Sequence, residues 1–123
     1  MSGGLVAGSD LWQLLEARVG MTPDAEALVD RAGRRVTFAQ LWEGSASRAS
    51  GLSAVGVTAG DTVAWELPTC VEAVELTLAL ARLEATQVPI IAIYREREVE
   101  HCCRQTGATW LLTSGAFRGY DFR

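Results

Sequence analysis

Apolar residues along this chain recur at two spacings, one typical of helices and one typical of buried strands. The three- and four-residue spacing predicts four helices: 11–19, 38–55, 70–83 and 95–106. Short β-prone apolar runs predict three strands: 62–67, 87–93 and 109–113. Because these strands alternate with helices, we expect an α/β fold in which parallel strands are joined by right-handed crossover helices.

The predicted helix ends carry residues suited to those positions. Thr37 followed by Gln40 has the spacing of a capping box, which would open the longest helix. Gly56 provides the left-handed backbone preferred where that helix ends. Thr69 with Glu72 repeats the capping-box spacing before the third helix. These signals fix where we expect each helix to begin or end.

The first third of the chain is organised differently. Residues 1–8 read as a flexible lead-in, and residues 9–123 as one continuous domain portion. Ser9 or Asp10 can cap the first helix, and Gly20 is expected to end it. Two short β candidates, Ala27–Asp30 and Arg35–Thr37, flank a turn with a Gly and so predict a β-hairpin. We expect that hairpin to lie apart from the parallel sheet or at its edge.

Composition narrows the class of protein. With 49% hydrophobic and 21% charged residues, the chain has the balance of an ordinary globular domain. Its net charge of −4 argues against nucleic acid and anionic membrane surfaces, which require basic patches. The longest apolar run, Val88–Ile93, is far shorter than the ~18 residues of a membrane span. An odd number of cysteines without regular spacing suits a reducing compartment. We expect a soluble, cytoplasmic protein without a transmembrane segment.

All 11 cationic residues are Arg, so the chain contains no Lys. Lysine-dependent chemistry is therefore excluded from these residues, including Schiff bases, Walker-type phosphate binding and lysine-assisted adenylate formation. Thr113-Ser114-Gly115 could begin a phosphate loop, but neither a further Gly cluster nor a Lys follows it. A turn that ends a strand is the favoured interpretation.

Two further clusters invite functional interpretations. His101-Cys102-Cys103 could suggest a metal site or a thiol nucleophile. Adjacent helical residues point about 100° apart and the chain has no second His, so buried cysteines beside a surface His are favoured.

The second of these clusters is the acidic one at the start of the fourth helix. Its residues are Arg95, Glu96, Arg97, Glu98 and Glu100. The carboxylates alternate with arginines and could serve as acid and base, but a solvated first helical turn is favoured. The four tryptophans are interpreted as core or interface residues: Trp12, Trp42, Trp65 and Trp110. The residues alone therefore predict no catalytic, cofactor-binding or metal-binding residue.

The order of motifs resembles the beginning of the AMP-forming acyl-CoA synthetases, a branch of the adenylate-forming superfamily. The resemblance covers residues 10–123 and rests on five segments in the same order: Thr22-Pro-Asp-Ala-Glu-Ala-Leu-Val-Asp, Arg35-Val-Thr-Phe-Ala-Gln-Leu, Gly51-Leu-Ser-Ala-Val-Gly-Val-Thr-Ala-Gly-Asp-Thr-Val-Ala-Trp-Glu-Leu-Pro, Val88-Pro-Ile-Ile-Ala-Ile-Tyr-Arg-Glu-Arg-Glu-Val and Phe117-Arg-Gly-Tyr-Asp-Phe. The fourth segment looks like the fatty-acid and cyclohexanecarboxylate–CoA ligases.

This resemblance implies an enzyme that activates a carboxylic acid with ATP and Mg²⁺ and then transfers the acyl group to coenzyme A. It also implies that this chain is part of the large N-terminal domain, truncated before the catalytic motifs. The family's phosphate loop, magnesium-binding Glu, ribose-binding Asp and lid lysine have no counterpart here. No functional residue is therefore carried over, and the fragment itself is expected to hold no cofactor.

Two positions depart from the family pattern. Glu84 stands where the family has Gly, so a left-handed backbone there would be strained by roughly 1 kcal/mol, or the cap would shift. Thr69 stands where Asn is common, which is a mild change because both residues cap helices.

Three hypotheses for function remain open. The first is an N-terminal fragment of an ATP-dependent fatty acid–CoA ligase, inactive alone, whose partners are the remainder of the ligase chain and a carboxylic acid substrate. The second is a non-catalytic interaction or dimerisation module with the same fold, whose partner could be a second copy of the chain. The third is the start of an amino-acid adenylation domain, which the Ile93-Tyr94 region disfavours.

Overall fold

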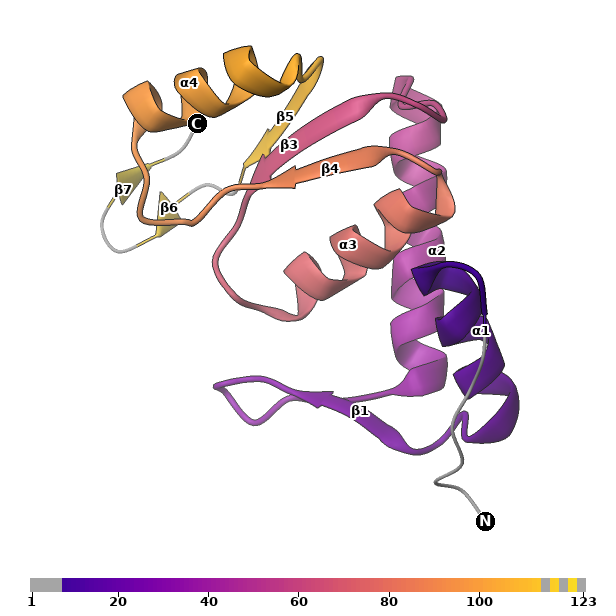
Figure 1. Ribbon diagram of the computed structural model, residues 1–123. Coiled ribbons are helices and arrows are strands. Elements are labelled where there is room, and N and C mark those ends of the chain that lie inside the picture. The colour runs from indigo at the N-terminus through magenta and orange to yellow at the C-terminus, as the bar shows by residue number, and fades with distance from the viewer. Residues whose placement is uncertain (1–7, 114–115, 118–119, 122–123) are drawn as a thin grey trace.

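The computed structural model describes residues 8–113, 116–117 and 120–121. The expected lead-in therefore lies outside the described residues except for Gly8. Figure 1 shows the elements in chain order: α1 (Leu11–Met21), β1 (Glu26–Val29), β2 (Arg35–Thr37), α2 (Phe38–Val55), β3 (Thr62–Glu66), α3 (Val71–Arg82), β4 (Thr86–Pro89), α4 (Glu96–Thr106), β5 (Trp110–Thr113), β6 (Ala116–Phe117) and β7 (Tyr120–Asp121).

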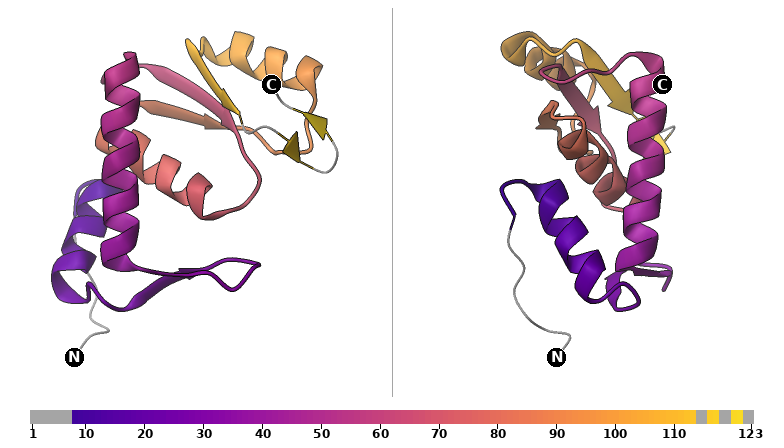
Figure 2. Two further views of the ribbon diagram at one scale, coloured as in Figure 1. Left: turned by 180° about the vertical axis from the view of Figure 1, so that it is seen from behind. Right: turned by 90° about the vertical axis from the view of Figure 1, so that its right-hand side faces the viewer.

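The main sheet has three parallel strands in the order β4-β3-β5. Helix α3 connects β3 to β4 and α4 connects β4 to β5, and the two helices lie on opposite sides of the sheet (Figure 1 and Figure 2). Along β3, Val63 packs in a cluster with Leu80 of α3, whereas Ala64 packs with Val99 of α4. The predicted α/β arrangement with parallel strands and crossover helices is confirmed.

A helical layer and a hairpin complete the fold on the α3 side. Helices α1, α2 and α3 share a core cluster that includes Trp12, Leu41 and Leu78. The hairpin β1–β2 is antiparallel and forms a separate two-stranded sheet below this layer (Figure 1). The prediction that the hairpin lies apart from the parallel sheet is therefore confirmed.

Helices α2 and α3 approach closely where α2 has small side chains. Ser45 and Ala49 are buried. A Cβ atom added at Gly44 would lie 1.8 Å from Oε2 of Glu75 on α3. The same Glu75 accepts a 2.9 Å hydrogen bond from Nε of Arg48. The small side chains on this face of α2 therefore allow the close approach of the two helices.

Several predicted helix ends are found where expected. Thr37 and Gln40 form the complete capping box of α2, with hydrogen bonds of 3.1 and 2.9 Å. Gly56 ends that helix with φ +113°. Asp10 caps α1 by accepting a 2.8 Å hydrogen bond from the Gln13 amide. Helix α1 continues through Gly20 to Met21, because a Gly in an α-helix is only mildly unfavourable.

The predicted capping box at Thr69 and Glu72 is wrong. Cys70 occupies the N-cap of α3, and no side chain caps this helix end. Glu72 instead accepts hydrogen bonds from Nη2 of Arg34, at 3.0 Å to both carboxylate oxygens. Arg34, on the hairpin, thus binds the Glu72 side chain that the local sequence pattern had predicted to cap the helix.

The second strand of the sheet is shorter than predicted. Strand β4 ends at Pro89, although the Ile90 amide still donates to the Trp65 carbonyl at 2.8 Å. The Tyr94 amide then donates to the Ile91 carbonyl at 3.0 Å, which forms a turn. The apolar run that predicted a longer strand therefore leaves the sheet halfway along.

The strain predicted at Glu84 is present. Glu84 has φ +60°, the only positive φ of a non-glycine residue among the described residues. We expect Glu84→Gly to raise the free energy of unfolding by roughly 0.5–1 kcal/mol, because Gly adopts this backbone without steric cost. Urea denaturation would measure it. Glu84→Ala keeps the Cβ atom and should show no such gain; equal stabilisation by both variants would mean that strain is not the cause.

Candidate functional site

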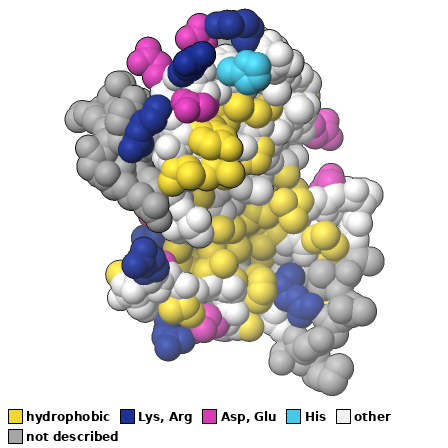
Figure 3. All heavy atoms as spheres, turned by 60° about the vertical axis from the view of Figure 1, so that its left-hand side comes forward, with side chains coloured by type: hydrophobic (Ala, Val, Ile, Leu, Met, Phe, Trp, Pro, Cys, Tyr) yellow, Lys and Arg dark blue, Asp and Glu magenta, His cyan; other side chains and the backbone are white. Residues whose placement is uncertain are grey.

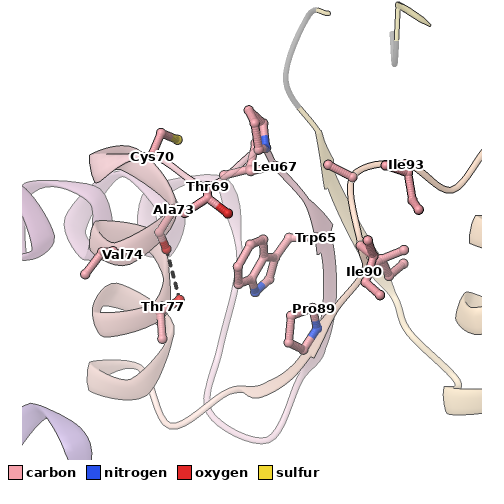
Figure 4. Close-up of a pocket in the computed structure, with 13 residues that line it drawn as sticks. Trp65, Leu67, Thr69, Cys70, Ala73, Val74, Thr77, Pro89, Ile90 and Ile93 are labelled. Carbon is pink, nitrogen blue, oxygen red and sulfur yellow. Dashed lines mark hydrogen bonds between the residues drawn. The ribbon is translucent and has the colours of Figure 1, made fainter. Parts of the chain in front are cut away.

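An apolar cavity lies where the C-terminal end of β3 meets the start of α3. Its volume is about 510 Å³, and it opens between α3 and the segment that follows β4 (Figure 4). In α/β folds, ligands bind at this end of the strands. The cavity is lined by Trp65, Leu67, Pro68, Thr69, Cys70, Ala73, Val74, Thr77, Pro89, Ile90, Ile91, Ala92 and Ile93.

Polar groups at the base of this cavity are satisfied within the protein. The Trp65 indole N–H donates to Oε1 of Gln87 at 3.2 Å, and Nε2 of Gln87 donates to the Thr77 carbonyl at 2.8 Å. The Thr77 hydroxyl donates to the Ala73 carbonyl at 2.9 Å (Figure 4). These polar groups hold β3, β4 and α3 together, and the surface left for a ligand or partner is mainly apolar.

A second, smaller cavity continues the first toward the hairpin. Its volume is about 180 Å³, and it shares Thr69, Cys70 and Val74 with the larger one. Its other lining residues are Leu28, Val29, Asp30, Arg31 and Val71. We call the two together the α3 hollow. Figure 3 shows apolar side chains gathered in the hollowed middle of this face.

Glu66, the last residue of β3, is a buried carboxylate on the α4 side of the sheet. Its side chain is 1% exposed, and its Oε2 atom has no hydrogen-bond partner among the described residues. Burial raises the pKa of Glu66; the positive charge of Arg95 counteracts this and the negative charge of Glu98 adds to it. The sequence analysis did not single out Glu66. A single acidic residue within an apolar strand could have indicated a buried carboxylate.

The His101-Cys102-Cys103 cluster does not form a site. His101 is exposed, whereas Cys102 and Cys103 are half-buried against the cluster that contains Ala64. Burial raises the pKa of the Cys103 thiol, which disfavours the reactive thiolate. The described residues contain no group of three or more His, Cys, Asp or Glu that could hold a metal ion.

The other residues that the sequence offered as site candidates lie at an exposed helix start or at the end of a strand. The carboxylates of Glu96, Glu98 and Glu100 are exposed, and Glu100 forms an ion pair with Arg104. Thr113 ends β5, whereas Ser114 and Gly115 of the proposed turn lie outside the described residues. The acidic cluster thus forms a solvated helix start, as favoured.

The tryptophans pack inside the fold, as interpreted. The rings of Trp12 and Trp42 lie 5.9 Å apart, and the guanidinium of Arg82 lies 4.8 Å from the Trp12 centroid. Trp110 donates to Oδ2 of Asp61 at 3.2 Å. Hydrogen bonds from the backbone of Thr58 and from Trp110 lower the pKa of Asp61, so this carboxylate is stabilised in the turn before β3.

The α3 hollow offers a mainly apolar surface. Cys70 lies on this surface, and no His is among its lining residues. No helix in the described part of the chain is long and apolar enough to cross a membrane.

Comparison with known proteins identifies the class to which this fold and site belong. The AMP-binding enzyme family matches residues 15–121, and the chain belongs to this family. Solved structures of adenylate-forming enzymes share its fold. O-succinylbenzoate coenzyme A synthetase from Bacillus subtilis, in complex with AMP, superposes with a TM-score of 0.81 and 30% identity, covering 89% of this chain and 28% of that one.

Relatives of two kinds match the sequence. Triostin synthetase I from Streptomyces triostinicus is 33% identical over 98% of this chain and 23% of its own length. Medium-chain fatty-acid–CoA ligase from Escherichia coli is 31% identical over 74% of this chain and 16% of its own length. The chain thus spans less than a quarter of the length of these curated relatives. The recognition of the adenylate-forming superfamily is confirmed.

Proposed function

We propose that this chain is the N-terminal portion of an enzyme that activates a carboxylic acid with ATP and Mg²⁺, and that it is inactive alone. The family match over residues 15–121 is the observation that carries the proposal. The chain's own chemistry supports it: there is no Lys to contact phosphates, and the larger cavity of the α3 hollow has no charged residue in its lining. These residues supply scaffold around a site whose reactive groups lie elsewhere in the enzyme.

Transfer of the acyl group to coenzyme A is the leading form of this proposal. The match to a fatty-acid–CoA ligase over 91 residues supports it. ATP, Mg²⁺ and coenzyme A are then the enzyme's cofactors and co-substrates, and the acid is its variable substrate. The cytoplasmic location expected from composition stays a prediction.

Adenylation of an amino acid or related acid within a larger synthetase is the second candidate. Triostin synthetase I aligns over more of this chain, and at slightly higher identity, than the CoA ligase does. The two candidates share the adenylation step and differ in the acid and in the thiol that accepts the acyl group.

Release of pyrophosphate from ATP that depends on an added carboxylic acid substrate tests the proposal. The complete enzyme should release pyrophosphate from ATP with a subset of acids, whereas the 123-residue chain should give no rate above background, because it lacks Lys and a phosphate loop among its described residues. Fatty acids that yield coenzyme A thioesters would favour the ligase, and amino acids that yield none would favour the synthetase. Adenylate formation by the chain alone would refute its inactivity.

A further inference from the structure

We propose that Glu66 makes the attachment of helix α4 to the sheet sensitive to pH. While the Glu66 carboxyl group is protonated, α4 stays closed over it. Once this group ionises, α4 opens locally and the α3 side of the sheet stays folded. This conformational device is separate from the proposed adenylation chemistry and does not depend on it.

Glu66 is buried on the face of the sheet that α4 covers (Figure 2). It is the last residue of β3, its side chain is 1% exposed, and its Oε2 atom has no hydrogen-bond partner among the described residues. Ala64, the preceding residue on the same face of β3, packs with Val99 of α4. A buried carboxyl group without such a partner costs much more free energy charged than neutral. Closure of α4 therefore favours the protonated form of Glu66.

The charged side chains that act on Glu66 belong to the start of α4. Burial raises the pKa of Glu66, the positive charge of Arg95 counteracts this, and the negative charge of Glu98 adds to it. The other described residues on this face have side chains that are uncharged or thiols: Val88, Ile90, Val99, Cys102, Cys103, Ala108 and Thr113. Burial also raises the pKa of the Cys103 thiol, which therefore titrates well above the acidic range. Ionisation of Glu66 thus acts mainly on the helix that covers it.

Helix α4 is held to the sheet by little buried surface. Within α4, Val99 alone is buried, whereas α3 on the opposite face has six buried residues. No side chain caps the N-terminal end of α4, where the N-cap residue Arg95 is exposed. Elements with few buried apolar contacts open locally at a lower free energy than that of global unfolding. Helix α4 can therefore open while α3 stays closed.

The direction of the pH effect follows from proton binding. In the open form Glu66 is hydrated and titrates near its ordinary pKa of 4.5, whereas in the closed form its pKa is raised. Opening at a pH between these two values releases one proton, so the equilibrium constant for opening rises about tenfold per pH unit in this window. Below about pH 4.5 and above the closed-state pKa, this constant no longer changes. Helix α4 is therefore held most firmly at the acidic end of the window.

Amide hydrogen exchange of the complete enzyme, measured by peptide mass spectrometry, tests this device. Rates are corrected for the intrinsic pH dependence of exchange, so that the remaining protection reports the opening equilibrium. Protection of the α4 amides should fall about tenfold per pH unit above about pH 4.5 and then become constant. At each pH the α4 amides should exchange at least about tenfold faster than those of α3, because their opening is local.

Three variants assign the effect to Glu66. Glu66→Gln should make the protection of α4 independent of pH, because the amide does not ionise. Glu98→Gln removes a negative charge that raises the pKa of Glu66, so the window should end at a lower pH and the total loss of protection should be smaller. Glu100→Gln is the matched control on the same helix: Glu100 is exposed and pairs with Arg104, so the wild-type profile should remain.

Three results would overturn the proposal. Protection of α4 that stays constant with pH in the wild-type enzyme would mean that no proton is released on opening. A pH dependence that persists in Glu66→Gln would assign the proton to another group. Equal protection of α3 and α4 at every pH would mean that α4 opens only when the whole domain unfolds. If Glu66→Gln does not fold, the wild-type profile and the shift in Glu98→Gln decide the question.

Discussion

Leu80→Ala should lower the free energy of unfolding by about 2–5 kcal/mol, the largest loss expected from a single core truncation in this chain. Leu80 is 0% exposed and packs with Val57, Val63 and Leu76 between α3 and the sheet. Truncation removes buried apolar surface and leaves a cavity that this well-connected cluster cannot fill completely. Because domains are stable by only about 5–15 kcal/mol, the variant should be near the limit of folding.

Urea denaturation followed by tryptophan fluorescence would measure this loss. Leu80→Met conserves volume and should cost less than about 1.5 kcal/mol, so it remains measurable if the Ala variant does not fold. Val55→Ala, at an exposed position, should change stability by less than about 0.5 kcal/mol. If Leu80→Ala and Val55→Ala were equivalent, the cluster around Leu80 would not be the core of the sheet layer.

Replacement of Glu66 should have the opposite effect. Glu66→Leu is expected to stabilise the fold at neutral pH by roughly 1–3 kcal/mol, because it removes a buried acceptor that has no hydrogen-bond partner. Ala64, the preceding residue on the same face of β3, packs in an apolar cluster with Ile90 and Val99, so an aliphatic side chain suits this side of the sheet. Loss of stability in this variant would show that the Glu66 carboxylate has a stabilising partner.

The pH dependence of stability gives an independent test of Glu66. Its pKa is raised above the ordinary 4.5 in the folded state, so the folded protein retains this proton at a pH where the unfolded chain has lost it. The contribution of Glu66 to stability is therefore complete below about pH 4.5 and declines as pH rises through the folded-state pKa. Glu66→Gln should remove that decline, and an unchanged pH profile would contradict the raised pKa.

Signals that act within a few residues predicted the fold well. The Thr37–Gln40 capping box and the Gly56 helix end depend on backbone groups three or four residues away. The strain at Glu84 is also confined to one turn, but it was predicted from the family pattern, in which Gly stands at this position. Alternating helices and strands then specified parallel pairing, because short crossovers leave few other arrangements.

The features that the sequence did not predict depend on residues far apart in the chain. Glu72 has the spacing for a cap, but Arg34 on the hairpin binds it. The burial of Glu66 follows from the position of α4. The α3 hollow is formed jointly by three elements, and no single stretch of sequence describes a concave surface. The candidate site was therefore less predictable than the fold that holds it.

The central position of β3 also affects the order in which this chain can fold during synthesis. Both strands that pair with β3, namely β4 on one side and β5 on the other, are synthesised after it, so β3 cannot pair until they have emerged. About 50 residues separate the beginning of β3 from the end of β5, which a ribosome adds in about 3–10 s. During that interval the nascent chain holds one face of β3 without Trp110 and Leu112, which belong to its finished cluster. We therefore expect the apolar face of β3 that Trp110 and Leu112 cover to be open to chaperones until β5 has emerged.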